Sequence, residues 1–344
     1  MSDLYDKYGW LNFEYIDSLP TWLNVIIGAR QVGKTYGTLL TMLRKNYYHM
    51  LLRRTTDELD MIAASPDLNP YQVFEPEYHV GFFRQSKKLC RICDYISDEN
   101  GNSVPGDQRG IATSLPQIGH VRGFNGSAFT DLVFDEVVPE KGVITRKAEG
   151  EMFLNAYVTV NGNRELAGMK PLRAWLLSNT NRIDSPILES LNLIDDILYM
   201  RRKEKEELIT DKGVLILQPG SVQIVEARAE TALMQQIEKK SDFYGMAINN
   251  EFAYDASPYV KTLSIKGMQP AWCYNDEVYC WQHSQGFYIN RAPFKKGDRY
   301  EGSRTGRESL YMNWSVMKPY YYSGMITFSD LKMLSVFKNI FDIE

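Results

Sequence analysis

Residues 28–35 read Gly28-Ala-Arg-Gln-Val-Gly-Lys-Thr35, a complete match to the pattern GxxxxGK(S/T) of a phosphate-binding loop (P-loop). A largely apolar run, residues 22–27, precedes the loop and predicts a buried strand. Apolar side chains at helical spacing follow Lys34 as far as about Asn46, and they predict a helix. Because this loop binds phosphate between a strand and a helix, the sequence predicts a nucleotide site here.

The residue types of the loop suit an anionic ligand. Its two glycines let the backbone fold around phosphate oxygens, and the helix N-terminus supplies a positive field. We expect Lys34 to reach the β- and γ-phosphates and the hydroxyl of Thr35 to bind Mg²⁺. Arg30 has either phosphate or a neighbouring carboxylate as its expected partner. The predicted nucleotide-binding residues are Gly28, Ala29, Arg30, Gln31, Val32, Gly33, Lys34 and Thr35.

A second motif narrows the reaction class. The stretch Asp131-Leu-Val-Phe-Asp135-Glu136 is an apolar strand that ends in carboxylates, the layout of a Walker B motif. Asp135 is expected to hold hydrated Mg²⁺, and Glu136 can polarise a water for in-line attack on the γ-phosphate. A small-molecule kinase needs no such base, so the pair favours a hydrolase. The sequence has no Asn/Thr-Lys-x-Asp segment for guanine recognition, which favours ATP over GTP.

Further residues complete the predicted catalytic set. Asn179, with Ser178 as second choice, follows a predicted strand and can sense the γ-phosphate or orient the water; a turn or helix cap is the alternative. Hydrolysis also needs a cation, which a neighbouring subunit often donates. Arg164 is the first choice because it lies in a polar loop that we expect to be exposed; a surface salt bridge is its alternative role. The other candidate arginines are Arg53, Arg54, Arg122 and Arg146.

The order of elements predicts an α/β fold with a parallel central sheet. Predicted strands cover residues 22–27, 48–54, 131–136 and 173–178, and predicted helices cover residues 34–46, 56–64 and 150–159. Between residues 64 and 131, two strands at 78–83 and 89–96 and a polar turn stretch at 97–110 predict a hairpin at one edge of the sheet.

A charge run, Arg201-Arg-Lys-Glu-Lys-Glu-Glu207, marks the predicted domain boundary. We expect a P-loop ATPase domain at residues 1–198, a charged linker at 199–213 and a smaller α+β domain at 214–344. Short alternating runs at 222–225, 278–281 and 286–289 predict an antiparallel sheet in the second domain.

Bulk composition excludes several classes of protein. The chain has 344 residues, 44% hydrophobic and 24% charged, which allows two domains with their own cores. A net charge of −4 excludes nucleic-acid binding through bulk positive charge, so any such contact needs local patches. No apolar run of membrane-spanning length and no signal peptide is present, so we expect a cytoplasmic protein without membrane contact. We expect reduced thiols rather than metal ligands at Cys90, Cys93, Cys273 and Cys280.

Residues 291–307 form a basic, glycine-punctuated segment that suits contact with a phosphate backbone without base readout. A solvated loop is the alternative interpretation. The predicted DNA-binding residues of this segment are Lys295, Lys296, Arg299, Arg304 and Arg307. Acidic residues Asp255, Asp276 and Glu277 leave a two-metal nuclease site open as a further alternative.

The ordered set of motifs resembles the DNA packaging (encapsidation) ATPases of phi29-like bacteriophages. The resemblance covers most of the first 200 residues. The residues that carry it are Gly28–Thr35, Leu-Leu-Arg53-Arg54, Leu-Val-Phe-Asp135-Glu136, Asn163-Arg164-Glu165 and Leu-Leu-Ser178-Asn179.

The resemblance implies an ASCE-type ATPase domain joined by a short linker to a domain similar to an RNase H-fold nuclease without its active site. It also implies a homopentameric ring that uses ATP and Mg²⁺ to drive double-stranded DNA through the portal of an empty capsid. Such a ring would work in the host cytoplasm, transiently attached to the procapsid, and some members use a packaging RNA. By position, Arg164 falls near the family's trans-acting arginine. Arg122 falls where the family has a basic residue that contacts DNA or a neighbour's nucleotide.

Besides a P-loop kinase, two other functions stay open at this point. One is a terminase-like packaging motor whose C-terminal domain still cuts DNA. The other is a nucleotide-gated DNA-binding or interaction protein that binds ATP with little turnover.

Overall fold

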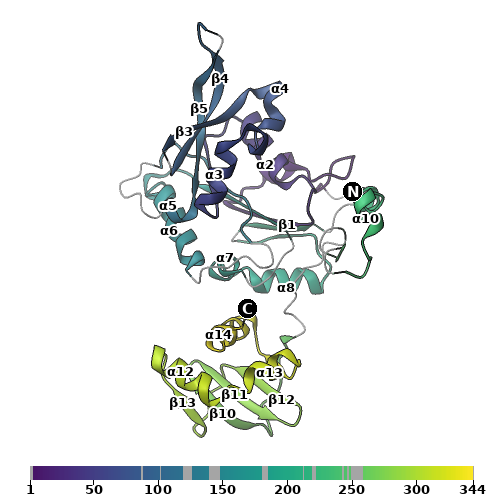
Figure 1. The fold of residues 1–344 in the computed structure, drawn as a ribbon, viewed down its shortest axis with the longest axis vertical. Coiled ribbons are helices and arrows are strands. Elements are labelled where there is room, and N and C mark those ends of the chain that lie inside the picture. Colours follow the sequence, from purple (N-terminus) through teal and green to yellow (C-terminus); the bar gives the residue numbers. More distant parts are fainter. Residues whose placement is uncertain are drawn as a thin grey trace. The chain divides into compact units, whose positions relative to one another are not determined.

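The computed structural model of the chain describes residues 3–86, 88–100, 102–118, 126–138, 148–179, 185–211, 213–218, 222–241, 244–245, 248 and 259–343. The chain divides into two compact units, residues 1–254 (unit 1) and residues 255–344 (unit 2), drawn in Figure 1. Within the described ranges, no helix has both the length and the apolar character needed to cross a membrane.

Unit 1 is built on a nine-stranded sheet with a parallel centre. In spatial order its strands are β3 (Val80–Ser86), β4 (Leu89–Ser97), β5 (Ser103–Ser114), β2 (His49–Arg53), β6 (Asp131–Phe134), β7 (Arg173–Asn179), β1 (Leu23–Gly28), β9 (Val214–Gln218) and β8 (Glu207–Ile209). The six neighbouring strands β5, β2, β6, β7, β1 and β9 run parallel to one another. The outer strands β3, β4 and β8 pair antiparallel. The predicted parallel α/β sheet is confirmed, with β7 between the strands of the two nucleotide motifs.

Helices cover both faces of this sheet, which is why its central strands are apolar on both sides. Phe13 of α1 lies 6.5 Å from Trp175 of β7 between ring centroids, whereas Phe134 of β6 stacks at 5.9 Å on Phe153 of α6. Thr55 caps α3, because its side chain accepts a hydrogen bond from the backbone nitrogen of Glu58. The α-helices are α1 (Phe13–Ser18), α2 (Lys34–Arg44), α3 (Thr56–Ala64), α4 (Glu75–Tyr78), α5 (Leu115–Ile118), α6 (Glu149–Asn161), α7 (Pro186–Ser190), α8 (Ile194–Arg202), α9 (Val222–Ala229) and α10 (Ala232–Gln236), and the 3₁₀ helices are η1 (Pro66–Leu68), η2 (Gln72–Phe74) and η3 (Glu165–Ala167).

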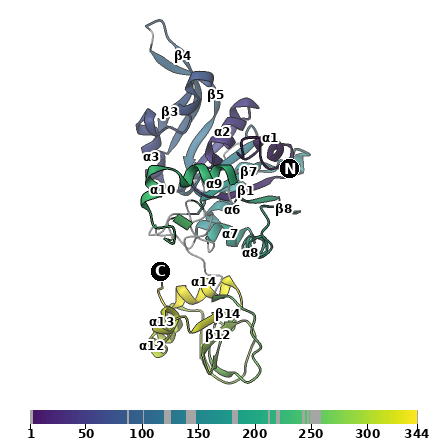
Figure 2. The same ribbon diagram turned by 90° about the vertical axis from the view of Figure 1, so that its right-hand side faces the viewer.

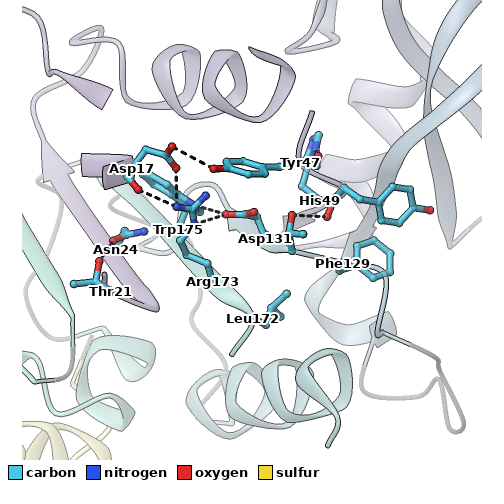
Figure 3. Close-up of polar contacts among 12 residues, drawn as sticks. Asp17, Thr21, Asn24, Tyr47, His49, Phe129, Asp131, Leu172, Arg173 and Trp175 are labelled. Carbon is cyan, nitrogen blue, oxygen red and sulfur yellow. Dashed lines mark hydrogen bonds and ion pairs between the residues drawn. The ribbon is translucent and has the colours of Figure 1, made fainter. Parts of the chain in front are cut away.

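A buried polar network joins the strands at the edge opposite their carboxyl ends (Figure 3). Arg173, the first residue of β7, contacts Asp131 and Asp17 at 2.6 Å each. Trp175 Nε1 donates to Asp131 Oδ1 at 2.9 Å, and the Arg173 guanidinium lies over the ring of Tyr47. Asp131 is 1% exposed, so it needs these partners. Of the carboxylates in the Walker B-like stretch, Asp131 therefore has a structural role.

The predicted hairpin has a third strand that the sequence did not indicate. β3 and β4 match the predicted strands, but β5 occupies residues that we expected to form a polar turn. β5 continues into the sheet and pairs parallel with β2, with His49 opposite Gly110. A Cβ on Gly110 would lie 2.0 Å from the His49 carbonyl oxygen, so this pairing requires glycine. Figures 1 and 2 show β4 and β5 extending as a ribbon beyond the rest of the sheet.

Residues 199–213 were expected to form a linker between two domains, but they belong to unit 1. α8 includes the first of them and buries Ile197 and Met200. β8 then pairs antiparallel with β9 at the edge of the sheet. The first unit thus extends past the predicted limit of 198 as far as residue 254, and unit 2 begins at 255 rather than 214. The predicted strand at 222–225 is also wrong, because these residues begin helix α9.

Unit 2 is an α+β unit with a mixed five-stranded sheet, and it confirms the α+β prediction for the C-terminal part. The central strands β10, β11 and β12 are antiparallel, and β13 and β14 pair parallel at the edges. Phe337 of α14 packs on Phe328 of β14 at 5.3 Å between ring centroids. The elements are β10 (Gln269–Tyr274), β11 (Val278–His283), β12 (Gly286–Asn290), β13 (Asp298–Tyr300), α12 (Arg304–Asn313), α13 (Met317–Tyr322), β14 (Ile326–Phe328) and α14 (Leu331–Ile340).

Candidate nucleotide-binding and hydrolysis site

Four parallel strands deliver the candidate site residues at their carboxyl ends. Gly28 ends β1, Arg53 ends β2 and Asn179 ends β7, while Asp135 directly follows β6. Because these strands run in one direction, their carboxyl ends lie at one edge of the sheet. The sheet therefore brings together residues that are up to about 150 positions apart in the sequence.

The P-loop has the backbone shape that its glycine pattern predicts. Gly33 has a φ of 83° and precedes α2, a left-handed conformation that glycine adopts without strain. Gln31 is also left-handed, with a φ of 57°. Ala29 and Val32 pack in a small apolar cluster with Ile224 of α9, which holds this helix against the loop.

Lys34 is buried at the centre of the site. Its Nζ donates to the carbonyl oxygens of Gly28 at 3.1 Å and Ala29 at 2.7 Å, and to Asn179 Oδ1 at 3.1 Å. Burial lowers the pKa of Lys34 to about 8; the Asp135 carboxylate opposes this shift and the Arg228 guanidinium adds to it. A bound phosphate would stabilise the charged form of Lys34, because it carries a full negative charge and the neighbouring carbonyl groups do not.

The predicted magnesium ligands are in direct contact. Thr35 Oγ1 donates to Asp135 Oδ1 at 3.0 Å, and Arg53 Nη1 lies 3.1 Å from Asp135 Oδ2. A hydroxyl and a carboxylate side by side are oxygen ligands of the kind that Mg²⁺ accepts. The donor set therefore fits the cation, and Arg53 holds the carboxylate in place from the end of β2.

Glu136 and Asn179 share one cavity with the P-loop. The cavity has a volume of about 260 Å³. Its lining residues are Gln31, Val32, Gly33, Lys34, Thr35, Tyr36, Asp135, Glu136, Ser178 and Asn179. Glu136 is exposed and has a φ of 60°, an uncommon conformation for a residue other than glycine, and such strain is concentrated at functional sites. The cavity thus combines a phosphate loop, a metal-ligand pair and a carboxylate that can accept a proton.

The two adjacent arginines at the end of β2 have different roles. Arg53 faces the site, whereas Arg54 forms a bidentate ion pair with Glu149 of α6, at 3.1 and 2.9 Å. The exposed fractions of these two side chains are only 4% and 7%. Arg54 is therefore a structural residue that joins β2 to α6.

The expectation of an exposed Arg164 is wrong. Its exposed fraction is 9%, and its guanidinium donates to the carbonyl oxygens of Lys170 and Phe129. These contacts tie the turn after α6 to the segment before β6, away from the P-loop cavity. Arg122 and Arg146 lie outside the described residues.

Arg228 of α9 is a residue that sequence reasoning missed. Its positive charge lowers the pKa of Lys34, and burial lowers the pKa of Arg228 itself. No ion pair of Arg228 occurs in the part of the chain that the structure describes. A cation that acts on Lys34 belongs to the electrostatics of the site, but no motif marks it, because only the packing of Ile224 brings α9 to the loop.

The basic segment of unit 2 is more ordered than its glycines suggested. All three of its predicted DNA-binding arginines have acidic partners: Arg299 contacts Asp276, Arg304 contacts Glu308 at 2.9 Å, and Arg307 contacts Asp342 at 3.3 Å. Lys295 and Lys296 are exposed. Of the acidic residues considered for a nuclease site, Asp276 is thus bound to an arginine, and Asp255 lies outside the described residues.

All four cysteines are buried and none forms a disulfide. Burial raises the pKa of the thiols of Cys90, Cys93, Cys273 and Cys280. In the described ranges, no group of three or more His, Cys, Asp or Glu side chains is arranged to hold a metal ion.

Comparison with solved structures finds this fold in phage DNA packaging motors. A chain of the bacteriophage Phi-29 viral genome packaging motor assembly aligns with 97% of this chain and 99% of its own length, at 17% identity and a TM-score of 0.65. A chain of the Phi-28 gp11 DNA packaging motor aligns with 98% of this chain and 99% of its own length, at 16% identity and a TM-score of 0.58. No protein-family model matches the sequence, and no curated protein matches it either. Along nearly its whole length, the chain therefore has the fold of the phi29-type DNA packaging motor subunits that its motifs resemble.

Proposed function

We propose that this protein is an ATP-driven motor that moves double-stranded DNA into a preformed viral procapsid. The observation that carries the proposal is the contact between Thr35 and Asp135, in a cavity that Lys34, Glu136 and Asn179 also line. The fold shared with packaging motor chains supports the same conclusion.

The residues of the site suggest their roles in hydrolysis. Lys34 and the loop backbone bind the phosphates, and Thr35 and Asp135 would hold Mg²⁺, which neutralises charge on the phosphate oxygens when it is bound. Glu136 accepts a proton from the water whose oxygen attacks the γ-phosphorus. The bond from this phosphorus to the bridging oxygen then breaks, and the products are ADP and inorganic phosphate. From the end of β7, the side-chain amide of Asn179 donates to a γ-phosphate oxygen or orients the attacking water.

The order of the strands supports an ASCE-type ATPase, because β7 lies between β1 and β6. We propose that the active form is a ring, a pentamer by its resemblance to phi29-type motors, in which a neighbouring subunit supplies a cation to the site. The ring would sit on the capsid portal in the host cytoplasm, with a packaging RNA as an optional partner. Arg122, Lys295 and Lys296 are candidates for contact with the DNA backbone.

Strand displacement tests the proposal directly. The protein is incubated with a double-stranded DNA that carries a fluorescent third strand bound as a triplex, and release of the third strand is followed over time. We expect release with ATP and Mg²⁺, and none with ATP alone or with the Asp135→Asn variant. Release that needs no nucleotide, or ATP hydrolysis that never displaces the strand, would contradict a translocase. ATP binding without turnover would instead indicate a nucleotide-gated interaction protein.

A further inference from the structure

A second cavity opens beside the phosphate cavity and has a volume of about 640 Å³. Both cavities are lined by Gln31, Val32, Gly33 and Tyr36, so they adjoin each other at the P-loop and the first turn of α2. The second one continues past Gly37 and Leu40 of α2 toward the N-terminal segment of the chain. Its size falls in the range of about 300–1,000 Å³ that small-molecule sites occupy.

The N-terminal segment presents an aromatic ring to this cavity. The exposed fraction of Trp10 is 43%, and a Cβ on Gly33 would lie 3.5 Å from Cε3 of its indole. The ring therefore lies directly beside the loop that binds phosphate. Tyr36, with an exposed fraction of 49%, lines the cavity from the first turn of α2. Tyr36 also packs on the buried ring of Phe74, at 4.9 Å between ring centroids, so Trp10 is the aromatic side chain better placed to stack on a ligand.

Hydrogen bonds hold the backbone of Trp10 in a tight turn, whereas its ring is exposed. Asp6 Oδ1 accepts hydrogen bonds from the backbone nitrogens of Tyr8 and Trp10 at 2.8 and 2.9 Å. The backbone nitrogen of Asp6 donates to the Trp10 carbonyl oxygen at 2.8 Å, which closes the turn. On either side, Leu4 and Leu11 are buried in the main core of unit 1. Because the backbone of the turn is already fixed, stacking of a ligand on Trp10 orders only its side chain.

Packing of α1 against α2 keeps the cavity open. Gly37 of α2 has no side chain, and a Cβ there would lie 2.1 Å from the ring of Phe13. This close approach places the segment before α1 at the edge of the loop, with apolar walls from Leu11 and Leu40. A planar base with its ribose fits beside these apolar walls, and Arg44 and Lys45, at the end of α2 away from the loop, also line the cavity.

We propose that this cavity binds the base and ribose of the nucleotide, with the indole of Trp10 as the stacking surface for the base. The inference rests on the proposed nucleotide site, and it adds the part of the site that holds the nucleoside. A nucleotide whose phosphates occupy the P-loop must place its nucleoside nearby, and this cavity adjoins the loop. Trp10 is then a binding residue contributed by a segment that carries no nucleotide motif.

The test compares two ligands that differ only in the nucleoside. Affinities for ATP and for inorganic tripolyphosphate are measured by calorimetry with the full-length protein and with Trp10→Ala. Base stacking is worth about 1–3 kcal/mol on truncation to alanine, so we expect Trp10→Ala to weaken ATP binding by about 5- to 150-fold. Tripolyphosphate binding should be unchanged. Trp10→Phe, which keeps an aromatic face, should restore most of the affinity for ATP.

Tyr8→Ala is the matched control, because Tyr8 lies in the same turn with an exposed fraction of 63% and does not line the cavity. It should leave both affinities unchanged. Equal loss of ATP and tripolyphosphate binding in Trp10→Ala would overturn the inference, because the effect would then come from the loop beneath the ring. Unchanged ATP binding in Trp10→Ala would overturn it as well. Failure of the wild-type protein to bind either ligand would contradict the proposed function itself.

Discussion

Arg54→Met should destabilise the protein strongly, because Arg54 has a structural role, unlike its neighbour Arg53 in the candidate site. Arg54 and Glu149 form a bidentate pair whose side chains are 4% and 7% exposed. Removing one partner leaves the Glu149 carboxylate buried without a counter-charge, which costs about 3–5 kcal/mol. For a domain of 150–250 residues each kcal/mol lowers the melting temperature by about 2–4 °C, so the expected decrease is about 6–20 °C.

Differential scanning calorimetry measures this decrease, with two further variants as references. Arg84→Met removes a surface ion pair with Asp60, whose side chains are 37% and 47% exposed. This variant should lose no more than about 1 kcal/mol. The double variant Arg54→Met/Glu149→Leu replaces both charges by apolar groups, so it should recover much of the lost stability. The reasoning is refuted if Arg54→Met and Arg84→Met melt alike, or if the double variant is no more stable than Arg54→Met.

Three further predictions concern the site and the sheet. Bound phosphate should raise the pKa of Lys34, which is about 8 in the free protein. ATP affinity should therefore fall by up to about tenfold per pH unit above pH 8. Titrations of ATP binding at pH 7, 8 and 9 check this, and an affinity that does not change with pH would contradict it. Gly110→Ala places a Cβ 2.0 Å from the His49 carbonyl oxygen, so we expect a loss of about 1–3 kcal/mol in urea unfolding, and an unchanged midpoint would contradict the β2–β5 pairing. Asp131→Asn should lower the melting temperature and leave ATP hydrolysis intact. Asp135→Asn should abolish Mg²⁺-dependent hydrolysis and leave the fold intact. Identical outcomes for the two variants would refute the assignment of a structural role to Asp131 and a metal-binding role to Asp135.

The sequence predicted those parts of the site that consecutive residues encode. The P-loop needs glycines at fixed offsets and a helix directly after it, so the spacing within residues 28–35 determines its shape. Asp135 and Asn179 were found because each follows a strongly apolar strand, and parallel strands bring their carboxyl ends together. Helix α3 was also predicted with its observed bounds, because Asp57 and Glu58 suit the first turn of a helix.

Features that depend on contacts between distant segments were missed or misjudged. Arg164 lies in a polar stretch, yet its guanidinium is buried because carbonyl groups from two other segments surround it. β5 carries a Gly- and Pro-containing polar sequence, but it becomes a strand through its pairing with β2 and β4. The run at 222–225 is too short for periodicity to separate strand from helix. Trp10 and Arg228 carry no motif, and only packing onto the P-loop reveals them.

Phosphate release by the wild-type protein and by Glu136→Gln tests the central claim most directly. The account predicts that wild-type protein hydrolyses ATP with Mg²⁺ and does so faster with double-stranded DNA. It predicts that Glu136→Gln loses this activity by about 100-fold or more, because the amide cannot accept the proton of the attacking water. ATP affinity, measured in parallel, should stay unchanged. A Glu136→Gln variant that hydrolyses ATP at the wild-type rate would contradict the account.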